Sequence, residues 1–254
     1  ALTANTTGTQ NTAVGRQAGD ANTVGSSNSI FGDGAYTSGT SGSNNTAIGK
    51  SALALSTTAA DNTAVGYQTL YSNTTGTDNN ALGKSALWSN TTGSLNTAMG
   101  DGAGYANTTG SYNTAIGASA LNSNTTASNN VAVGYQSLYA NTTGGENTAS
   151  GYRALHNNTT PSNNTAFGYA ALVANTTGGE NTVAVGFRAG TAVTTGIRNT
   201  FIGGLAGDAL TDATDNVAIG QTALGLDTLG NKSVAVGRAA LAIQNFTSAA
   251  DSYN

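Results

Sequence analysis

Apolar and polar positions along this chain repeat with a period of 17 residues. The period is anchored by a glycine that closes segments reading N-T-A-V-G or close variants of it. Twelve of the thirteen spacings between these glycines are 17 residues, and the spacing from Gly168 to Gly186 is 18. A fixed period of this length is typical of a stacked repeat architecture. The anchoring glycines are Gly15, Gly32, Gly49, Gly66, Gly83, Gly100, Gly117, Gly134, Gly151, Gly168, Gly186, Gly203, Gly220 and Gly237.

Each repeat carries its own pattern around this glycine. The residue before it is apolar in thirteen repeats, the second before it is alanine in twelve, and the fourth before it is asparagine in twelve. Leucine follows four residues after the glycine in nine repeats, and threonine follows eight residues after it in thirteen. Alternation over T-A-V predicts a short strand, and the glycine and the N-T-T-G segment predict turns. We therefore expect each repeat to form one coil of two short strands and two turns.

The register predicts a single all-β domain over residues 1–254, a parallel β-solenoid of about fourteen coils. Residues 1–10 form a partial coil, residues 11–237 the regular coils, and residues 238–254 the last coil with a cap or a transition. We place the extra residue of the one longer repeat within 181–185, just before the strand closes. Because the chain starts in register inside a coil, we expect it to be one length of a longer array.

The alanine column is our candidate for an oligomer interface. A coil of 17 residues offers about two large apolar side chains, too few to offset the entropy of ordering its backbone. If those side chains point inward, the alternating alanines point outward and form a flat apolar ladder. Such a ladder suits close contact with a second chain. The proposed interface residues are Ala47, Ala64, Ala81, Ala98, Ala115, Ala132, Ala149 and Ala166.

The repeat also resembles a known family. Segments reading N-V-A-V-G and N-V-A-I-G, at residues 130–134 and 216–220, are similar to the N-S-V-A-I-G motif of trimeric autotransporter adhesin heads. The longer form with N-T-T-G turns resembles repeats of phage and bacterial fibres. The resemblance implies a left-handed β-roll, three chains around one axis, and a surface-attached adhesive or fibre role. The adhesin repeat is usually shorter.

Composition and charge narrow the function classes. Charged residues make up 8% of the chain, its net charge is −4, and lysine and arginine form no cluster, so nucleic acid is not an expected partner. No apolar stretch is long enough to span a membrane, and the chain has no cysteine. The one histidine, His156, has no carboxylate pair close by in sequence. We therefore expect no enzyme activity, no cofactor and no metal site. A polysaccharide-cleaving solenoid is the alternative that clustered acids or a pair of lysine or arginine residues would support.

Two further groups of polar residues have competing interpretations. Asp208, Asp212 and Asp215 suggest either a calcium site or a solvated loop, and we favour the loop. The many N-x-T sequons are glycosylation acceptors in a eukaryotic secreted protein, whereas asparagine and threonine are also what the turns need. We favour the turn interpretation there as well.

Aromatic columns are the candidate ligand contacts. One column holds Tyr71, Trp88, Tyr105, Tyr139 and His156, and another, directly after the glycine, holds Tyr135, Tyr152, Tyr169 and Phe187. Exposed aromatic ladders stack on sugars, and they also stabilise stacked coils or fill a groove between chains.

Taken together, these patterns lead to one functional hypothesis and two alternatives. We expect an extracellular, homotrimeric fibre segment on a cell surface or virion, whose partners are itself and a surface glycan or host protein. A phage tail-fibre shaft is the first alternative. A threonine-ladder solenoid that binds ice is the second.

Overall fold

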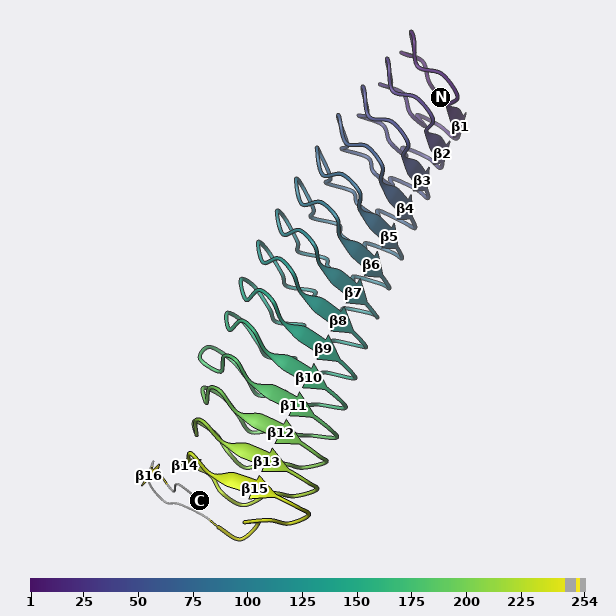
Figure 1. Cartoon of the computed structure of the whole chain (residues 1–254). Helices are drawn as coiled ribbons and strands as arrows, with labels where there is room; N and C mark the ends of the chain where they lie inside the picture. The colour runs from purple at the N-terminus through teal and green to yellow at the C-terminus, as the bar shows by residue number, and fades with distance from the viewer. Residues whose placement is uncertain (245–249, 252–254) are drawn as a thin grey trace. The chain divides into compact units, whose positions relative to one another are not determined.

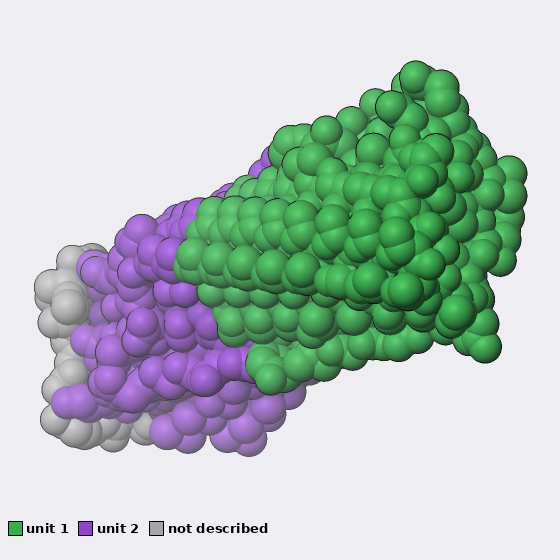
Figure 2. Space-filling view, turned by 90° about the horizontal axis from the view of Figure 1, so that it is seen from above, with its two compact units in different colours: residues 1–128 green, residues 129–254 purple. Residues whose placement is uncertain are grey.

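The computed structural model describes residues 1–244 and 250–251. It contains no helix in that part of the chain, and short strands recur once in each coil (Figure 1). Two compact units are distinguished, unit 1 over residues 1–128 and unit 2 over residues 129–254 (Figure 2). On the visible face of unit 1, atoms line up in parallel rows, as expected when equivalent side chains stack from coil to coil. A single domain over the whole chain stays a prediction.

The strands are three residues long, apart from two shorter ones near the C-terminal end. Unit 1 holds β1 (Thr12–Val14), β2 (Ser29–Phe31), β3 (Thr46–Ile48), β4 (Thr63–Val65), β5 (Asn80–Leu82), β6 (Thr97–Met99) and β7 (Thr114–Ile116). Unit 2 holds β8 (Val131–Val133), β9 (Thr148–Ser150), β10 (Thr165–Phe167), β11 (Val183–Val185), β12 (Thr200–Ile202), β13 (Val217–Ile219), β14 (Gly230–Asn231), β15 (Val234–Val236) and β16 (Ala250–Asp251).

Within each unit the three-residue strands pair in parallel and in register. In unit 1, for example, Ala47 of β3 lies opposite Ala64 of β4, one repeat further along. In unit 2, β13 pairs with β15 in the same way, while β14 pairs with β16. This arrangement confirms the parallel β-solenoid with a 17-residue coil. The number of chains around its axis, and its hand, stay predictions.

The second strand that we expected directly after the anchoring glycine of each coil is not present in the described residues; β14 lies later in its coil, in the turn region. After the strand, positive φ angles recur at every second residue instead: φ is +136° at Gly66, +53° at Gln68 and +51° at Leu70. A strand needs extended angles throughout, so this segment forms a turn-like ribbon. Its N–H groups still bond to neighbouring coils, as Leu70 does to the carbonyl of Ala86 at 3.0 Å.

The anchoring glycine is required by both backbone angle and space. Gly83 has φ of +131°, and a Cβ built on it would lie 2.6 Å from the carbonyl oxygen of Gly100 in the next coil. That angle is far from the left-handed well near +57° that other residues visit. Coils can therefore stack at strand spacing only where this position has no side chain.

The extra residue of the one longer repeat lies in a turn, and our placement of it within 181–185 is wrong. Strand β11 keeps its three residues, with Val183 opposite Thr165. The Asn175 amide reaches the carbonyl of Gly179, four residues on, whereas its equivalents bond to the third residue on. Turns accept insertions because they have no ladder to interrupt, whereas a bulge in β11 would break the pairing on both sides.

The interior of each coil is built from small apolar residues, leucine and buried asparagine. A first asparagine column stands four residues before the glycine. There, Asn45 donates its amide to the carbonyl of Ala59 across the same coil, and its backbone N–H donates to the side-chain oxygen of Asn28. A second column stands seven residues after the glycine, where Asn90 donates to the side-chain oxygen of Asn73 and to the carbonyl of Gly93, both at 2.8 Å. Buried amides in such numbers are tolerated because they are hydrogen-bonded.

Removing one of these amides should be costly. We expect Asn90→Ala to lower the free energy of unfolding by about 2–3 kcal/mol, because it leaves the Gly93 carbonyl and the Asn73 oxygen buried without this donor. Urea unfolding followed by circular dichroism measures the loss. Asn157→Ala is the control, since Asn157 is exposed and its side chain is hydrogen-bonded to the neighbouring His156 ring at the surface. Equal midpoints for the two variants would contradict the structural role of the ladder.

Candidate functional site

The alanine column lies inside the coils, so the outward direction that we inferred for it is wrong. All eight proposed interface alanines are buried, from 0% exposed at Ala47 to 2% at Ala81 and Ala115. Two positions of this column hold a large residue instead of alanine, Ile30 and Phe201, and their neighbours show which column the alanines pack against. A Cβ on Gly19 would lie 2.8 Å from Ile30, and a Cβ on Gly207 would lie 2.5 Å from Phe201. The alanine column therefore packs against the leucine column, and a large residue in one is matched by glycine in the other.

The apolar residues just before the glycine point outward instead. Because side chains alternate along a strand, an inward alanine places its neighbour on the opposite face of the sheet. We call this set the outer apolar column. In unit 1 it comprises Val14, Phe31, Ile48, Val65, Leu82, Met99 and Ile116. In unit 2 it comprises Val133, Phe167, Val185, Ile202, Ile219 and Val236, with Ser150 as the one polar residue in the same position.

Most of the outer apolar column is open to water in the isolated chain. Met99 is 43% exposed and Leu82 is 47% exposed, although each belongs to a strand paired on both sides. Between them lies a shallow apolar hollow of about 150 Å³, lined also by Thr63, Asn80 and Thr97. A sheet face of this kind offers a row of large side chains with room for a facing row to insert between them.

The aromatic candidates form stacks, as the column register predicts. In unit 1, Trp88 lies between Tyr71 and Tyr105, with ring centroids 5.6 Å and 5.4 Å apart and nearly parallel planes. In unit 2, Tyr139 stacks on His156 at 5.1 Å. Stacked rings cover one another's faces, so a ligand meets mainly ring edges and the faces at the ends of each stack. Ligand contact at these five residues stays a prediction, while their stabilising role is supported by the stacking geometry.

His156 has the surroundings of a structural side chain. Burial lowers its pKa, a hydrogen bond with Asn157 opposes that shift, and the charge of Arg153 lowers the pKa further. The ring therefore stays neutral near pH 7. Across the described residues, no cluster of three or more histidine, cysteine, aspartate or glutamate side chains is arranged to hold a metal ion.

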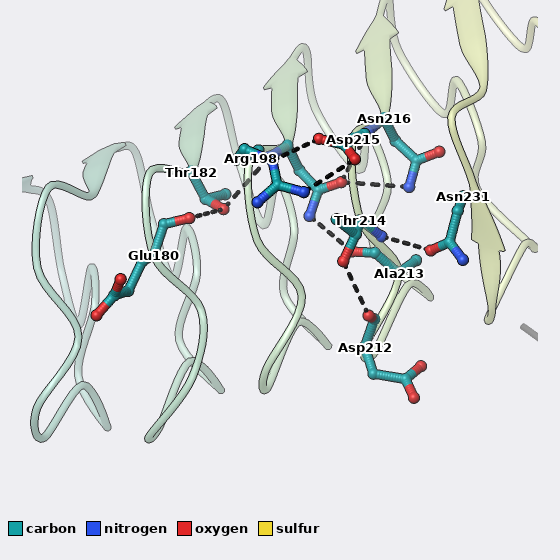
Figure 3. A network of polar contacts seen from close by, with 10 residues as sticks. Glu180, Thr182, Arg198, Asp212, Ala213, Thr214, Asp215, Asn216 and Asn231 are labelled. Carbon is teal, nitrogen blue, oxygen red and sulfur yellow. Dashed lines mark hydrogen bonds and ion pairs between the residues drawn. The ribbon is translucent and has the colours of Figure 1, made fainter. Parts of the chain in front are cut away.

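The three aspartates considered for calcium do not converge on one point. Asp215 forms a bidentate ion pair with Arg198, with N–O distances of 2.6 and 3.0 Å (Figure 3). This ion pair holds the pKa of the Asp215 carboxyl below its usual value. The carboxylate of Asp212 points away from this pair in the same view. Burial raises the pKa of Asp208, with Arg188 opposing the shift. The solvated-loop interpretation is the one that this arrangement supports.

The sequon asparagines support the turn interpretation too. They belong to the second asparagine column, where their amides are directed inward to turn carbonyls, as Asn107 donates to Gly110 at 2.9 Å. In a folded coil, the side-chain amide nitrogen to which a glycan would be attached is therefore buried and hydrogen-bonded. The sequon residues in question are Asn73, Asn90, Asn107, Asn124, Asn141 and Asn175.

The two threonine columns of the turn differ in their surroundings. In the first, the hydroxyl of Thr74 donates to the carbonyl of Thr91 at 3.0 Å, and this bond recurs from coil to coil. The residues that follow, such as Thr75 and Thr92, are exposed. The turn therefore presents one column of exposed threonines beside a column whose hydroxyl groups already donate to backbone carbonyls.

No protein-family model, curated protein or solved structure matches this chain. Nor does any helix among the described residues have the length and apolarity needed to cross a membrane. Arguments about function therefore rest on the ladders themselves.

Proposed function

We propose that this chain is a structural and adhesive segment of an extracellular, homotrimeric fibre on a cell surface. The observation that carries the proposal is the outer apolar column of unit 1. It places one apolar side chain from each of seven successive coils on the outer face of one sheet. Monomeric soluble proteins rarely leave a continuous apolar patch of more than a few hundred Å² open to water. The resemblance of the repeat to adhesin heads supports three copies around one axis.

A second copy of the chain is the partner that best fits this column. The column has one residue per coil. A second copy of the chain has the same spacing between coils, so the side chains of the two columns stay in register along the interface. The column carries no charge in either unit, so nothing in it resists loss of water. The hollow between Leu82 and Met99 would receive a side chain from the facing row.

Charge on the outer apolar column should prevent assembly. We expect the double variant Leu82→Asp, Met99→Asp to sediment as a single chain at micromolar concentration, because burying unpaired carboxylates at an interface costs several kcal/mol for each site. Sedimentation velocity, run beside the unchanged protein, gives the assembly state.

The matched control places the same two charges elsewhere on the coil. Thr92→Asp with Thr109→Asp alters exposed turn residues of neighbouring repeats, and we expect this variant to assemble as the unchanged protein does. If the Leu82 and Met99 variant stays assembled, the outer apolar column is not the interface.

The alternatives differ in what surrounds the segment rather than in its fold. A phage tail-fibre shaft would use the same column in the same way. The ice-binding alternative draws on the exposed threonines of unit 1, Thr58, Thr75, Thr92, Thr109 and Thr126. It is the weaker proposal, because the adjacent threonine column donates its hydroxyl groups to backbone carbonyls.

A further inference from the structure

Unit 2 contains a groove that the sequence patterns do not single out. Its floor is formed at the second position after the anchoring glycine, where Ala170 stands between Arg153 and Arg188 of the flanking coils. All three residues have left-handed φ angles, between +52° and +54°, so they are equivalent rungs of one column. Because alanine replaces a long side chain at the middle rung, an open hollow of about 400 Å³ remains between the two arginines.

The walls of the groove come from the two neighbouring columns. One wall is the stack of Tyr152, Tyr169 and Phe187, whose ring centroids are 5.0 and 5.4 Å apart. The other wall is formed by Val173 and Thr191. The three rings of the first wall are about half exposed, at 43% to 53%. The groove thus combines ring edges and phenol hydroxyl groups on one side with an aliphatic surface on the other.

Neither arginine of the groove forms a direct ion pair with a carboxylate in the part of the chain that the structure describes, although Asp208 lies close enough to Arg188 for the arginine's charge to lower the pKa of that aspartate. Arg16 and Arg198 each form an ion pair with an aspartate one coil away, at 2.9 and 2.6 Å. Across residues 1–244, neither Arg153 nor Arg188 forms such a pair, and the Nε atom of Arg153 is buried without a hydrogen-bond partner. No acidic residue lines the groove. In a chain of net charge −4, two guanidinium groups are therefore left to meet an external anion.

The spacing of the arginines and the nature of the walls indicate an extended ligand. Two coil spacings separate the backbones of Arg153 and Arg188 by about 9.6 Å, further than one carboxylate extends. A chain that carries carboxylates at intervals can reach both. Sugar rings, with alternating C–H surface and hydroxyl groups, match walls that alternate apolar ring edges with phenol hydroxyls.

We propose that the groove between Arg153 and Arg188 binds an acidic polysaccharide through carboxylates on successive sugar units, with its sugar rings against Tyr152, Tyr169 and Phe187. The site deepens the adhesive part of the proposed function and rests on it in that respect. It lies within unit 2 of one chain, whereas the residues changed in the assembly test belong to unit 1. Ligand binding and assembly can therefore fail independently.

Titration calorimetry with an oligomer of galacturonic acid tests the proposal. We expect the unchanged protein to bind it, more weakly as salt is raised, and to bind a neutral galactose oligomer of equal length at least tenfold less tightly. Arg153→Gln and Arg188→Gln should each weaken binding about tenfold or more, as expected for loss of a charge-assisted hydrogen bond. Glutamine already occupies this column at Gln68 and Gln136, with similar φ angles, so the coil should tolerate it.

Two further variants separate the groove from general charge. Ala170→Gln fills the floor while keeping both arginines, and it should also abolish binding. Arg238→Gln removes an exposed arginine that does not line the groove, and it should leave the affinity unchanged. Circular dichroism checks that each variant is folded.

Four results would overturn the proposal. They are unchanged affinity in the double variant Arg153→Gln, Arg188→Gln; unchanged affinity in Ala170→Gln; equally tight binding of an oligoglutamate peptide; and failure of the unchanged protein to bind either the galacturonic acid oligomer or an oligomer of sialic acid. The peptide result would assign the groove to acidic proteins instead.

Discussion

The variant Ala98→Asp should unfold more readily than the unchanged protein by about 4 kcal/mol at neutral pH. Ala98 is 1% exposed and lies between Ala81 and Ala115 of the adjoining strands, so the new carboxylate has neither water nor a cation. Urea unfolding at neutral pH measures the loss. The loss should shrink as the pH falls from neutral toward about 4, the ordinary pKa of aspartate, because burial raises the pKa of the carboxyl in the folded state and the protonated form costs less to bury.

The neighbouring residue provides the comparison. Met99→Asp places the same group one position further along the strand, on the outer face, where the side chain is 43% exposed. We expect it to retain the strand signal in circular dichroism and to lose assembly. If Ala98→Asp were as stable as the unchanged protein, the alanine column would not be the core of the coil.

The second large effect concerns the anchoring glycine. Gly83→Ala should cost about 3 kcal/mol or more, since φ of +131° is strained for any residue with a Cβ and the added carbon would press on the Gly100 carbonyl. Unfolding midpoints in urea measure it. The expected loss is local in origin, so the strand signal of the folded variant should remain that of the unchanged protein.

Gly102→Ala is the matched control for Gly83→Ala. Gly102 has φ of +63°, and a Cβ there would find its nearest neighbour 3.5 Å away. Alanine already stands at the equivalent position in Ala170, with φ of +52°. We expect a loss of only about 1–2 kcal/mol, because alanine at a left-handed φ angle is strained even where there is room for its Cβ. Similar losses for the two glycine variants would show that stacking does not depend on the anchoring glycine.

The parallel solenoid was predictable from the sequence because its cause is periodic. A glycine every 17 residues allows the close approach of coils, and buried asparagines recur at the same spacing. The absence of the second strand was not predictable from alternation, because positive φ angles recur at every second residue from Gly66 to Leu70 and so mimic the two-residue period of a strand. Leucine at φ near +50° is unusual enough that a sequence pattern does not suggest it.

The direction of the alanine column was the main error, and its cause is physical. A period of two shows that two sets of residues face opposite ways, but not which set faces inward. We assigned the larger residues to the core, whereas the coil is too narrow to hold them beside leucine. The sequence did contain the decisive signal. Ile30 and Phe201, the two large residues in the alanine column, coincide with glycines in the leucine column at Gly19, Gly190 and Gly207.

The groove in unit 2 was missed for a different reason. Its residues belong to three columns and three coils, and no single column is unusual on its own. What makes the groove is one alanine between two arginines at a spacing of one coil. Reading each column along its length, rather than each repeat along the chain, would have shown that combination.

The solution mass of the unchanged chain tests the central claim most directly. Sedimentation equilibrium over a micromolar concentration range should give three times the chain mass of 24.9 kDa, because the outer apolar column is then covered by other copies. A mass of 24.9 kDa across that range would contradict the account, since it would leave this column exposed to water along both units.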